Sequence, residues 1–231
     1  MKISNKFVHE LDWSDDMSFI YEQSMKIYKE LPYIYDPSNE TDFFKEYIKP
    51  NYSLYDPDKP LMQVVRTSGV SEFDALNTIF EKYGLNPAIK FFQSDPTVEK
   101  FKNVEHLFFA HRHHKLTSVA ALVFPIAGCN EDTVTTWPAY EDVDGYEDTT
   151  KGIYWSEYYH NVYNKNDPKY LLSDEEAVCR YVLKDNPVLW NVKQFHEAVN
   201  KGSSHRVIAN INFIDCEKTW EDTIATLEGS K

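Results

Sequence analysis

FHEAVNKGSSHR, residues 195–206, joins two apolar, strand-like segments across a short polar turn. His196 lies on the first segment, and Arg206, ten residues later, begins the second. Side chains on two strands that are joined in this way can point into one cavity. A histidine there can hold a metal ion, and an arginine can hold a carboxylate. The stretch therefore predicts a β framework in which a metal and an acid share one site.

Further histidines gather upstream, where His111, His113 and His114 lie close together in the sequence. Because side chains alternate along a strand, His111 and His113 are expected on the same side of it. With His196 from a later strand they would make three ligands, which leave positions on an iron ion for a co-substrate and oxygen. The alternative is that these are surface or core histidines without a metal.

Arg206 opens the apolar run Val207–Ile211. An arginine that enters a buried strand needs a partner, because burying its charge alone is costly. A bound carboxylate meets that need through two parallel hydrogen bonds. The competing partner is an acidic side chain of the protein itself. Asn200 is expected to shape the turn after His196.

The composition is that of a globular chain. Its 231 residues are 42% hydrophobic and 15% aromatic, which predicts one domain over residues 1–231. The net charge of −13 argues against general binding to nucleic acid. No apolar run approaches the roughly 18 to 20 residues that span a bilayer, and the N-terminus lacks the apolar core of a signal peptide. No membrane association is expected.

Cysteine usage points to a reducing compartment. Cys129, Cys179 and Cys216 are odd in number and far apart, and none belongs to a Cys-x-x-Cys pair. That pattern favours reduced thiols in the cytoplasm over a disulfide scaffold or a cysteine-rich zinc site.

Helical patterns come first in the chain and strand patterns second. Helices are expected at residues 16–31, from Ser38 to Ile48 and from Ser71 to Tyr83, within a mainly helical support spanning residues 1–103. The strand-like runs are Leu107–Arg112, Val119–Ile126, Thr133–Trp137, Ala177–Leu183, Val188–Val192, Phe195–Asn200 and Arg206–Phe213. This order predicts an α+β fold in which the β core is a sandwich or barrel over residues 104–214, followed by a C-terminal tail at 215–231.

An insertion interrupts the strands between Pro138 and Tyr170. It is acidic and rich in tyrosine. We expect it to be partly helical and to fold over one mouth of the barrel. Its aromatic side chains can serve packing, or they can stack on a planar group of a substrate.

The motif His196-Glu-Ala-Val-Asn200, followed by Ser-Ser-His-Arg206-Val-Ile, resembles the C-terminal motif of the Fe(II)/2-oxoglutarate-dependent dioxygenases. The stretch from Ala121 to Trp137 looks like strands of small, poorly characterised members of that superfamily. The resemblance covers roughly residues 104–214. It implies a double-stranded β-helix, or jelly-roll, fold. It also implies that His196 is the distal iron ligand and that Arg206 binds the distal carboxylate of 2-oxoglutarate.

The first metal motif departs from the family. The family has His-x-Asp or His-x-Glu, whereas this chain has His111-Arg112-His113 in the best register. Three interpretations stay open. His113 replaces the carboxylate in an all-histidine triad, or His113 is the first ligand with Lys115 at the carboxylate position, or the site is degenerate and the protein is not catalytic.

These observations lead to one expected function and two alternatives. The expected protein is a cytoplasmic Fe(II)/2-oxoglutarate-dependent oxygenase, a hydroxylase of an unidentified small molecule or peptide. His111, His113 and His196 would hold the metal, and Arg206 would hold the co-substrate. One alternative is a three-histidine, cupin-like dioxygenase that does not use 2-oxoglutarate. The other is a catalytically degenerate jelly-roll protein with a binding or structural role.

Overall fold

The computed structural model describes most of the predicted β core and three helices. The described residues are 3–30, 63–64, 71–94, 96, 106–113, 117–138, 145–148, 153–156, 177–214 and 216–229. Of these, the backbone alone is described at 30, 63–64, 71–72, 106–111, 117–118, 145–148 and 153–156. The helix expected between Ser38 and Ile48, together with His114, Lys115 and most of the insertion, lies outside these residues.

The structure combines helices with antiparallel sheets, and the α+β prediction is confirmed. The helices are α1 (Asp15–Glu30), α2 (Ser71–Glu81) and α4 (Trp220–Glu228). The strands are β1 (Val8–Glu10), β2 (Gln63–Val64), β3 (Asn86–Ser94), β4 (His106–His113), β5 (Thr117–Ala127), β6 (Thr133–Pro138), β7 (Gly145–Asp148), β8 (Ile153–Ser156), β9 (Ala177–Val182), β10 (Val188–Asn191), β11 (His196–Asn200) and β12 (Arg206–Ile214). Within the described part of the chain, no helix is long and apolar enough to cross a membrane.

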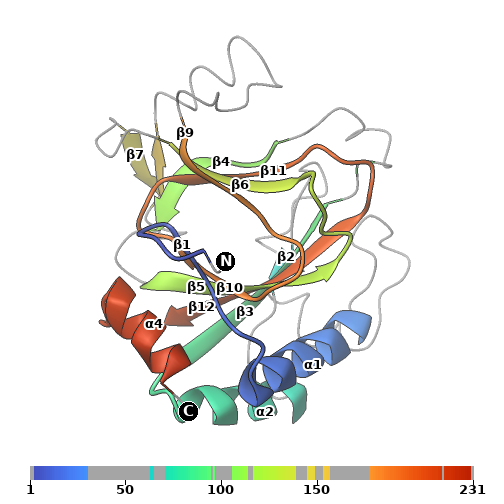
Figure 1. The fold of residues 1–231 in the computed structure, drawn as a ribbon, viewed down its shortest axis with the longest axis vertical. Coiled ribbons are helices and arrows are strands. Elements are labelled where there is room, and N and C mark those ends of the chain that lie inside the picture. The colour runs from blue at the N-terminus through green and yellow to red at the C-terminus, as the bar shows by residue number, and fades with distance from the viewer. Residues whose placement is uncertain are drawn as a thin grey trace.

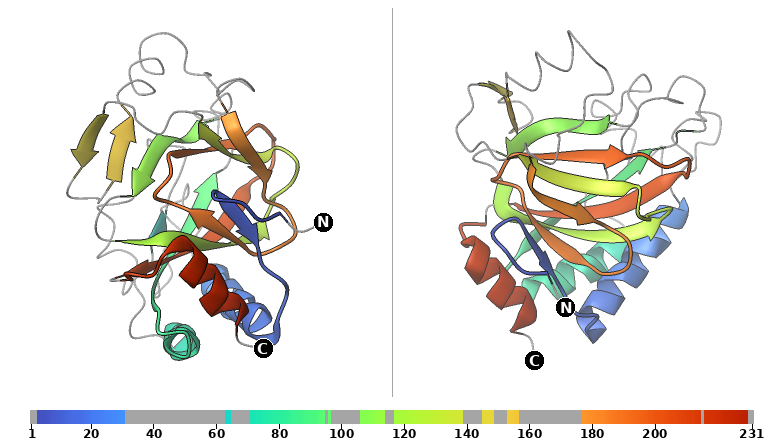
Figure 2. Two further views of the ribbon diagram at one scale, coloured as in Figure 1. Left: turned by 60° about the vertical axis from the view of Figure 1, so that its left-hand side comes forward. Right: turned by 45° about the horizontal axis from the view of Figure 1, so that its top comes forward.

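The strands form two antiparallel sheets of six strands each. Sheet A has the order β1-β10-β5-β12-β3-β2, and sheet B has the order β7-β8-β4-β11-β6-β9. The two sheets face each other, and the three helices cover the outer side of sheet A (Figure 1). Figure 2 shows the same layers from two other directions. From β3 to β6, and again from β9 to β12, each strand is followed by one in the other sheet, whereas β6 to β9 all lie in sheet B.

One hydrophobic core lies between sheet A and the helices. Strand β12 reads RVIANINFI, and its odd-numbered residues from Val207 to Phe213 are buried in this core together with Phe80 of α2 and Trp220 of α4. The Phe80 and Phe213 rings lie 5.6 Å apart. The strand alternates between two faces, so its even-numbered residues point to the other side, towards sheet B.

A second core lies between the two sheets. It contains Ile208 and Trp190 of sheet A and Trp137 of sheet B. The two tryptophan rings meet edge to face with centroids 6.5 Å apart. We call the side of each sheet that faces the other sheet its inter-sheet face. Because sheet A is buried on both sides, its strands are apolar over most of their length.

Three features of the structure add to what the sequence predicted. Residues 1–103 were expected to be mainly helical support, yet β3 is a full strand of sheet A. Buried and half-buried residues alternate along β3. The buried ones include Ile89 and Phe91, which face the helices. The C-terminal tail holds α4, where the Thr219 hydroxyl caps the helix by accepting from the Asp222 N–H. The described parts of the insertion are the strands β7 and β8 rather than helix.

Candidate metal and acid site

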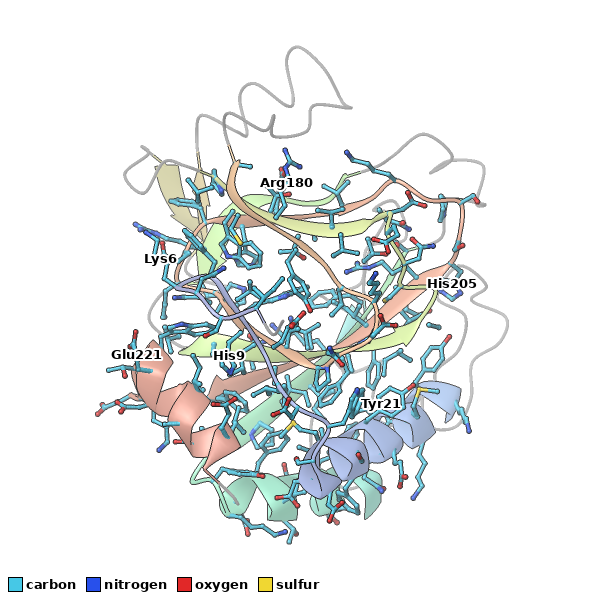
Figure 3. The ribbon with its side chains drawn as sticks, in the orientation of Figure 1. Lys6, His9, Tyr21, Arg180, His205 and Glu221 are labelled. Atoms are coloured by element: carbon cyan, nitrogen blue, oxygen red, sulfur yellow. The ribbon has the colours of Figure 1, made fainter. Side chains whose placement is uncertain are left out.

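The turn between β11 and β12 is built around Asn200, as the sequence predicted. Its Oδ1 accepts a hydrogen bond from the Gly202 N–H at 3.2 Å. Its Nδ2 donates to the Ser204 carbonyl and, across to sheet A, to Ser94 Oγ, both at 3.3 Å. Because β11 lies in sheet B and β12 in sheet A, this turn joins the two sheets. Figure 3 shows His205 at this end of the molecule, one residue before Arg206.

His196 is buried on the inter-sheet face of β11. Its Nδ1 lies 2.9 Å from the Gln194 carbonyl oxygen and donates to it. Burial lowers the pKa of His196 to about 4, so the ring is neutral at pH 7. Donation from Nδ1 leaves the lone pair on Nε2. A backbone carbonyl that orients a ring in this way is the usual partner of a metal-binding histidine.

The His113 ring lies beside the His196 ring. Their ring centroids are 5.7 Å apart. The His113 N–H donates to the Val192 carbonyl at 2.7 Å, which fixes the end of β4 against the turn that follows β10. The backbone register pairs His196 directly with His111 on β4. Among the described side chains, no group of three or more His, Cys, Asp or Glu gathers as a metal site; the His111 side chain is not one of those described.

Arg206 is buried at the start of β12, with 1% of its surface exposed. It shares the inter-sheet face with Ile208, because the two residues are separated by one along the strand. Its Nε and Nη2 atoms have no hydrogen-bond partner among the described residues. Burial lowers the pKa of the Arg206 guanidinium, and its contact with the Cys129 thiol partly opposes that effect. No acidic side chain in the described part of the chain pairs with Arg206, so the competing partner suggested by the sequence is not found there.

Other polar atoms on the inter-sheet faces also lack partners within the described residues. They are Thr135 Oγ1, Trp137 Nε1, Trp190 Nε1 and Asn212 Oδ1. Buried polar atoms are almost always hydrogen-bonded in native proteins. Unpaired polar atoms on the facing sides of both sheets therefore indicate that a polar ligand completes the structure between them.

Sequence reasoning did not identify Cys129, Lys90, Asn210 or Asn212 as part of this region. The asparagines carried a signal, because they are alternate polar residues in the otherwise apolar strand from Arg206 to Ile214. A polar residue at every second position of a buried strand marks one face as polar. Cys129 and Lys90 had no comparable signal, since only the tertiary structure brings β3 and the turn after β5 to Arg206 and its neighbours.

Comparison with known proteins gives similarity in structure alone. No protein-family model and no curated protein sequence matches the chain. Among solved structures, it resembles the non-heme alpha-ketoglutarate-dependent epimerase SnoN from nogalamycin biosynthesis. The two share 12% identity at a TM-score of 0.38, over 84% of this chain and 80% of that one.

Two further structures extend the comparison. HygX from Streptomyces hygroscopicus, solved with nickel, 2-oxoglutarate and hygromycin B, matches at 6% identity and a TM-score of 0.45, over 92% of this chain and 84% of that one. The L-ribose isomerase of Cellulomonas parahominis matches at 10% identity and a TM-score of 0.32, over 90% and 86%. The structures that this chain resembles thus include 2-oxoglutarate-dependent enzymes and a sugar isomerase, and these similarities assign it to no family.

Proposed function

We propose that the chain is a single-domain jelly-roll oxygenase that binds Fe(II) and 2-oxoglutarate. The strands that support this fold are β3, β4, β5, β6, β9, β10, β11 and β12. They pair as β10-β5-β12-β3 in one sheet and β4-β11-β6-β9 in the other. Two such four-stranded layers, connected by repeated crossing between sheets, are the plan of a double-sheet jelly roll.

The observation that carries the proposal is the buried guanidinium of Arg206, whose Nε and Nη2 lack a hydrogen-bond partner among the described residues. A buried arginine without an acidic partner is destabilising for the protein alone. Its free Nε and Nη2 donors offer the geometry that a carboxylate accepts from an arginine. A 2-oxo acid with a distal carboxylate meets both requirements.

The imidazoles support the metal part of the proposal. The His113 and His196 rings are close enough to reach one ion, and neutral imidazole is a suitable ligand for Fe(II). We propose His111 as the third ligand, because its backbone position lies directly opposite His196. All three ligands would be neutral, whereas the related dioxygenases supply one carboxylate.

Fe(II) with 2-oxoglutarate supplies, when bound, an oxidation that is coupled to decarboxylation of the 2-oxo acid. The residues of the chain prepare the site for it. The Gln194 carbonyl keeps the His196 ring in the tautomer that presents Nε2. Arg206 orients the co-substrate by its distal carboxylate. Trp137, Val123 and Ile208, all buried between the sheets, exclude bulk water from the same space.

The test is an anaerobic titration of Fe(II) into the metal-free protein, with and without 2-oxoglutarate, followed by visible absorption. Wild type should develop a charge-transfer band when both are present. Arg206→Met should bind Fe(II) but lose the band, because the carboxylate has no partner. Lys201→Met, which changes an exposed charge in the same turn, should behave as wild type. The proposal is wrong if His196→Ala binds Fe(II) and 2-oxoglutarate as tightly as wild type.

The same experiment separates the alternatives. A three-histidine dioxygenase without a 2-oxo acid would keep its metal after Arg206→Met and would release no succinate under oxygen. A degenerate binding protein would show no band under any of these conditions.

A further inference from the structure

Lys90 places a second cation on the inter-sheet face of sheet A. It belongs to β3, where Ile89 and Phe91 face the helices and Phe92 packs against the core between the sheets. Alternation along the strand puts Lys90 on the same face as Phe92. Its partner across the strands is Asn210 of β12, which lies on the face of Ile208 and Arg206.

The Lys90 ammonium has no counter-ion among the described residues. It makes no hydrogen bond or ion pair with the described residues. Burial lowers its pKa, and no neighbouring charge offsets that effect. An unpaired lysine in such surroundings is stabilised by an anion that arrives from outside the protein.

Solvent reaches this part of the inter-sheet face. Ala88, Lys90 and Phe92 are half-buried, whereas Pro87, Ile89 and Phe91, which face the helices, are buried. A well-packed core would bury both faces alike. The partial exposure of three alternate residues therefore marks a place where packing is incomplete and a ligand can enter.

The neighbouring asparagines supply further polar groups. Asn212 Nδ2 donates to Asn210 Oδ1 at 2.8 Å, which turns the Asn210 amide nitrogen away from that bond. This nitrogen makes no hydrogen bond with the described residues, so it is an available donor beside Lys90. An ammonium and an amide N–H together suit the two oxygens of a carboxylate.

We propose that Lys90 and Asn210 form an acid-binding subsite, and that the substrate of the proposed oxygenase is a carboxylic acid with a compact apolar body. Phe92 and Ala88 flank Lys90 on its strand, and Val123 pairs with Asn210 from the other side. These side chains would receive the apolar part of the substrate. The catalytic role of the subsite rests on the proposed function, but acid binding itself requires neither metal nor 2-oxoglutarate.

The subsite is separate from that of Arg206. Arg206 pairs with Ser94 and Asn210 pairs with Lys90, so the two rows are four residues apart along β3. At about 3.3 Å per residue this corresponds to roughly 13 Å between the backbone positions. The competing explanation is that Lys90 and Arg206 together bind the two carboxylates of one co-substrate molecule.

The experiment is a calorimetric titration of benzoate into the metal-free protein, with benzamide as the uncharged ligand control. Wild type should bind benzoate and not benzamide. Lys90→Met, which keeps an unbranched side chain but removes the ammonium, should weaken benzoate binding by about tenfold or more, since a hydrogen bond to a charged group is lost. Lys90→Arg should retain binding and shows that the position tolerates substitution. Lys201→Met, which changes an exposed charge outside the subsite, should bind benzoate as wild type does.

A second titration, with 2-oxoglutarate present at saturation, separates the two sources of the acid. Unchanged benzoate affinity supports a substrate subsite. Displacement of benzoate by 2-oxoglutarate in wild type, together with weakened 2-oxoglutarate binding in Lys90→Met, would overturn it and assign Lys90 to the co-substrate. Absence of benzoate binding to wild type, or its retention in Lys90→Met, would also overturn it. None of these outcomes depends on the iron titration that tests the proposed function.

Discussion

Arg206 and Lys90 are cations that face the space between the sheets, in a protein whose net charge is −13. Neither is paired with a carboxylate in the described part of the chain. A charge inside a protein is retained at a cost to stability unless something pairs with it. At the scale of the residue, these side chains are therefore better explained by a ligand than by the fold.

Arg206→Met should stabilise the ligand-free protein. The substitution removes an uncompensated buried charge and replaces it with an apolar side chain of similar length, so the free energy of unfolding should rise by about 1 kcal/mol or more. Urea denaturation of wild type and variant without ligand measures this change. A lower midpoint in the variant would mean that the guanidinium has a stabilising partner after all.

His196 should make the metal-free protein sensitive to mild acid. Its pKa is about 4 in the folded state and near 6.5 when unfolded, so the unfolded state binds the proton first as the pH falls. The stability due to the neutral ring is complete above about pH 6.5 and is lost towards pH 4, by on the order of 3 kcal/mol at most.

Urea denaturation at pH 7.5 and pH 4.5 tests this effect against His196→Asn, whose side chain does not titrate and can still donate to the Gln194 carbonyl. Wild type should lose more stability than the variant over this interval. Equal losses would show that the His196 ring is not protected from protonation in the folded protein.

At the scale of the element, the unit that builds the site is β11, the turn and β12. The turn is held from the side by the loop after β5, where Gly128 has φ +63° and lies against the His205 backbone. A Cβ at residue 128 would collide with the His205 carbonyl. The close approach sets the position of the residue that precedes Arg206, and the Lys201 N–H adds a hydrogen bond to the Asp132 carbonyl at 3.0 Å.

Gly128→Ala should therefore destabilise the protein by about 2 kcal/mol or more, because it combines backbone strain with the collision. Gly84→Ala is the matched control. Gly84 has nearly the same backbone angle, φ +62°, but nothing lies within 4 Å of its added Cβ, so strain alone should cost about 1 kcal/mol. Thermal unfolding of both variants gives the comparison, and equal losses would contradict the close approach.

At the scale of the whole molecule, sheet A belongs to two cores at once. Alternate residues of β12 pack against the helices and against the inter-sheet core. Loss of either core removes support from the same strands. The helices and both sheets are therefore expected to unfold together, as one domain.

Calorimetry of the metal-free protein should accordingly show one transition, with equal calorimetric and van't Hoff enthalpies. Phe213→Ala, which removes a ring from the helix-facing core, should shift the entire transition to lower temperature. Two separated transitions, or a shift confined to one of them, would contradict a single cooperative domain.

The sequence by itself determined most strands of the fold and one half of the candidate site. Apolar alternation predicted the strands from β4 to β12 outside the insertion, and the helical period predicted α1 and α2. The His196 to Arg206 spacing predicted that β11 and β12 are joined by a short turn. These features are local, because the hydrophobic pattern and the turn residues act over a few neighbouring positions.

Tertiary structure alone decided what surrounds those residues. It brought β3 beside β12, so that Lys90 meets Asn210, and it placed His113 next to His196 although 82 positions separate them in the chain. It also left Arg206 without an acidic partner in the part of the chain that the structure describes, which no local pattern could foretell. The physical reason is that strand pairing and burial join residues distant in sequence, and whether a buried charge finds a partner depends on that long-range packing.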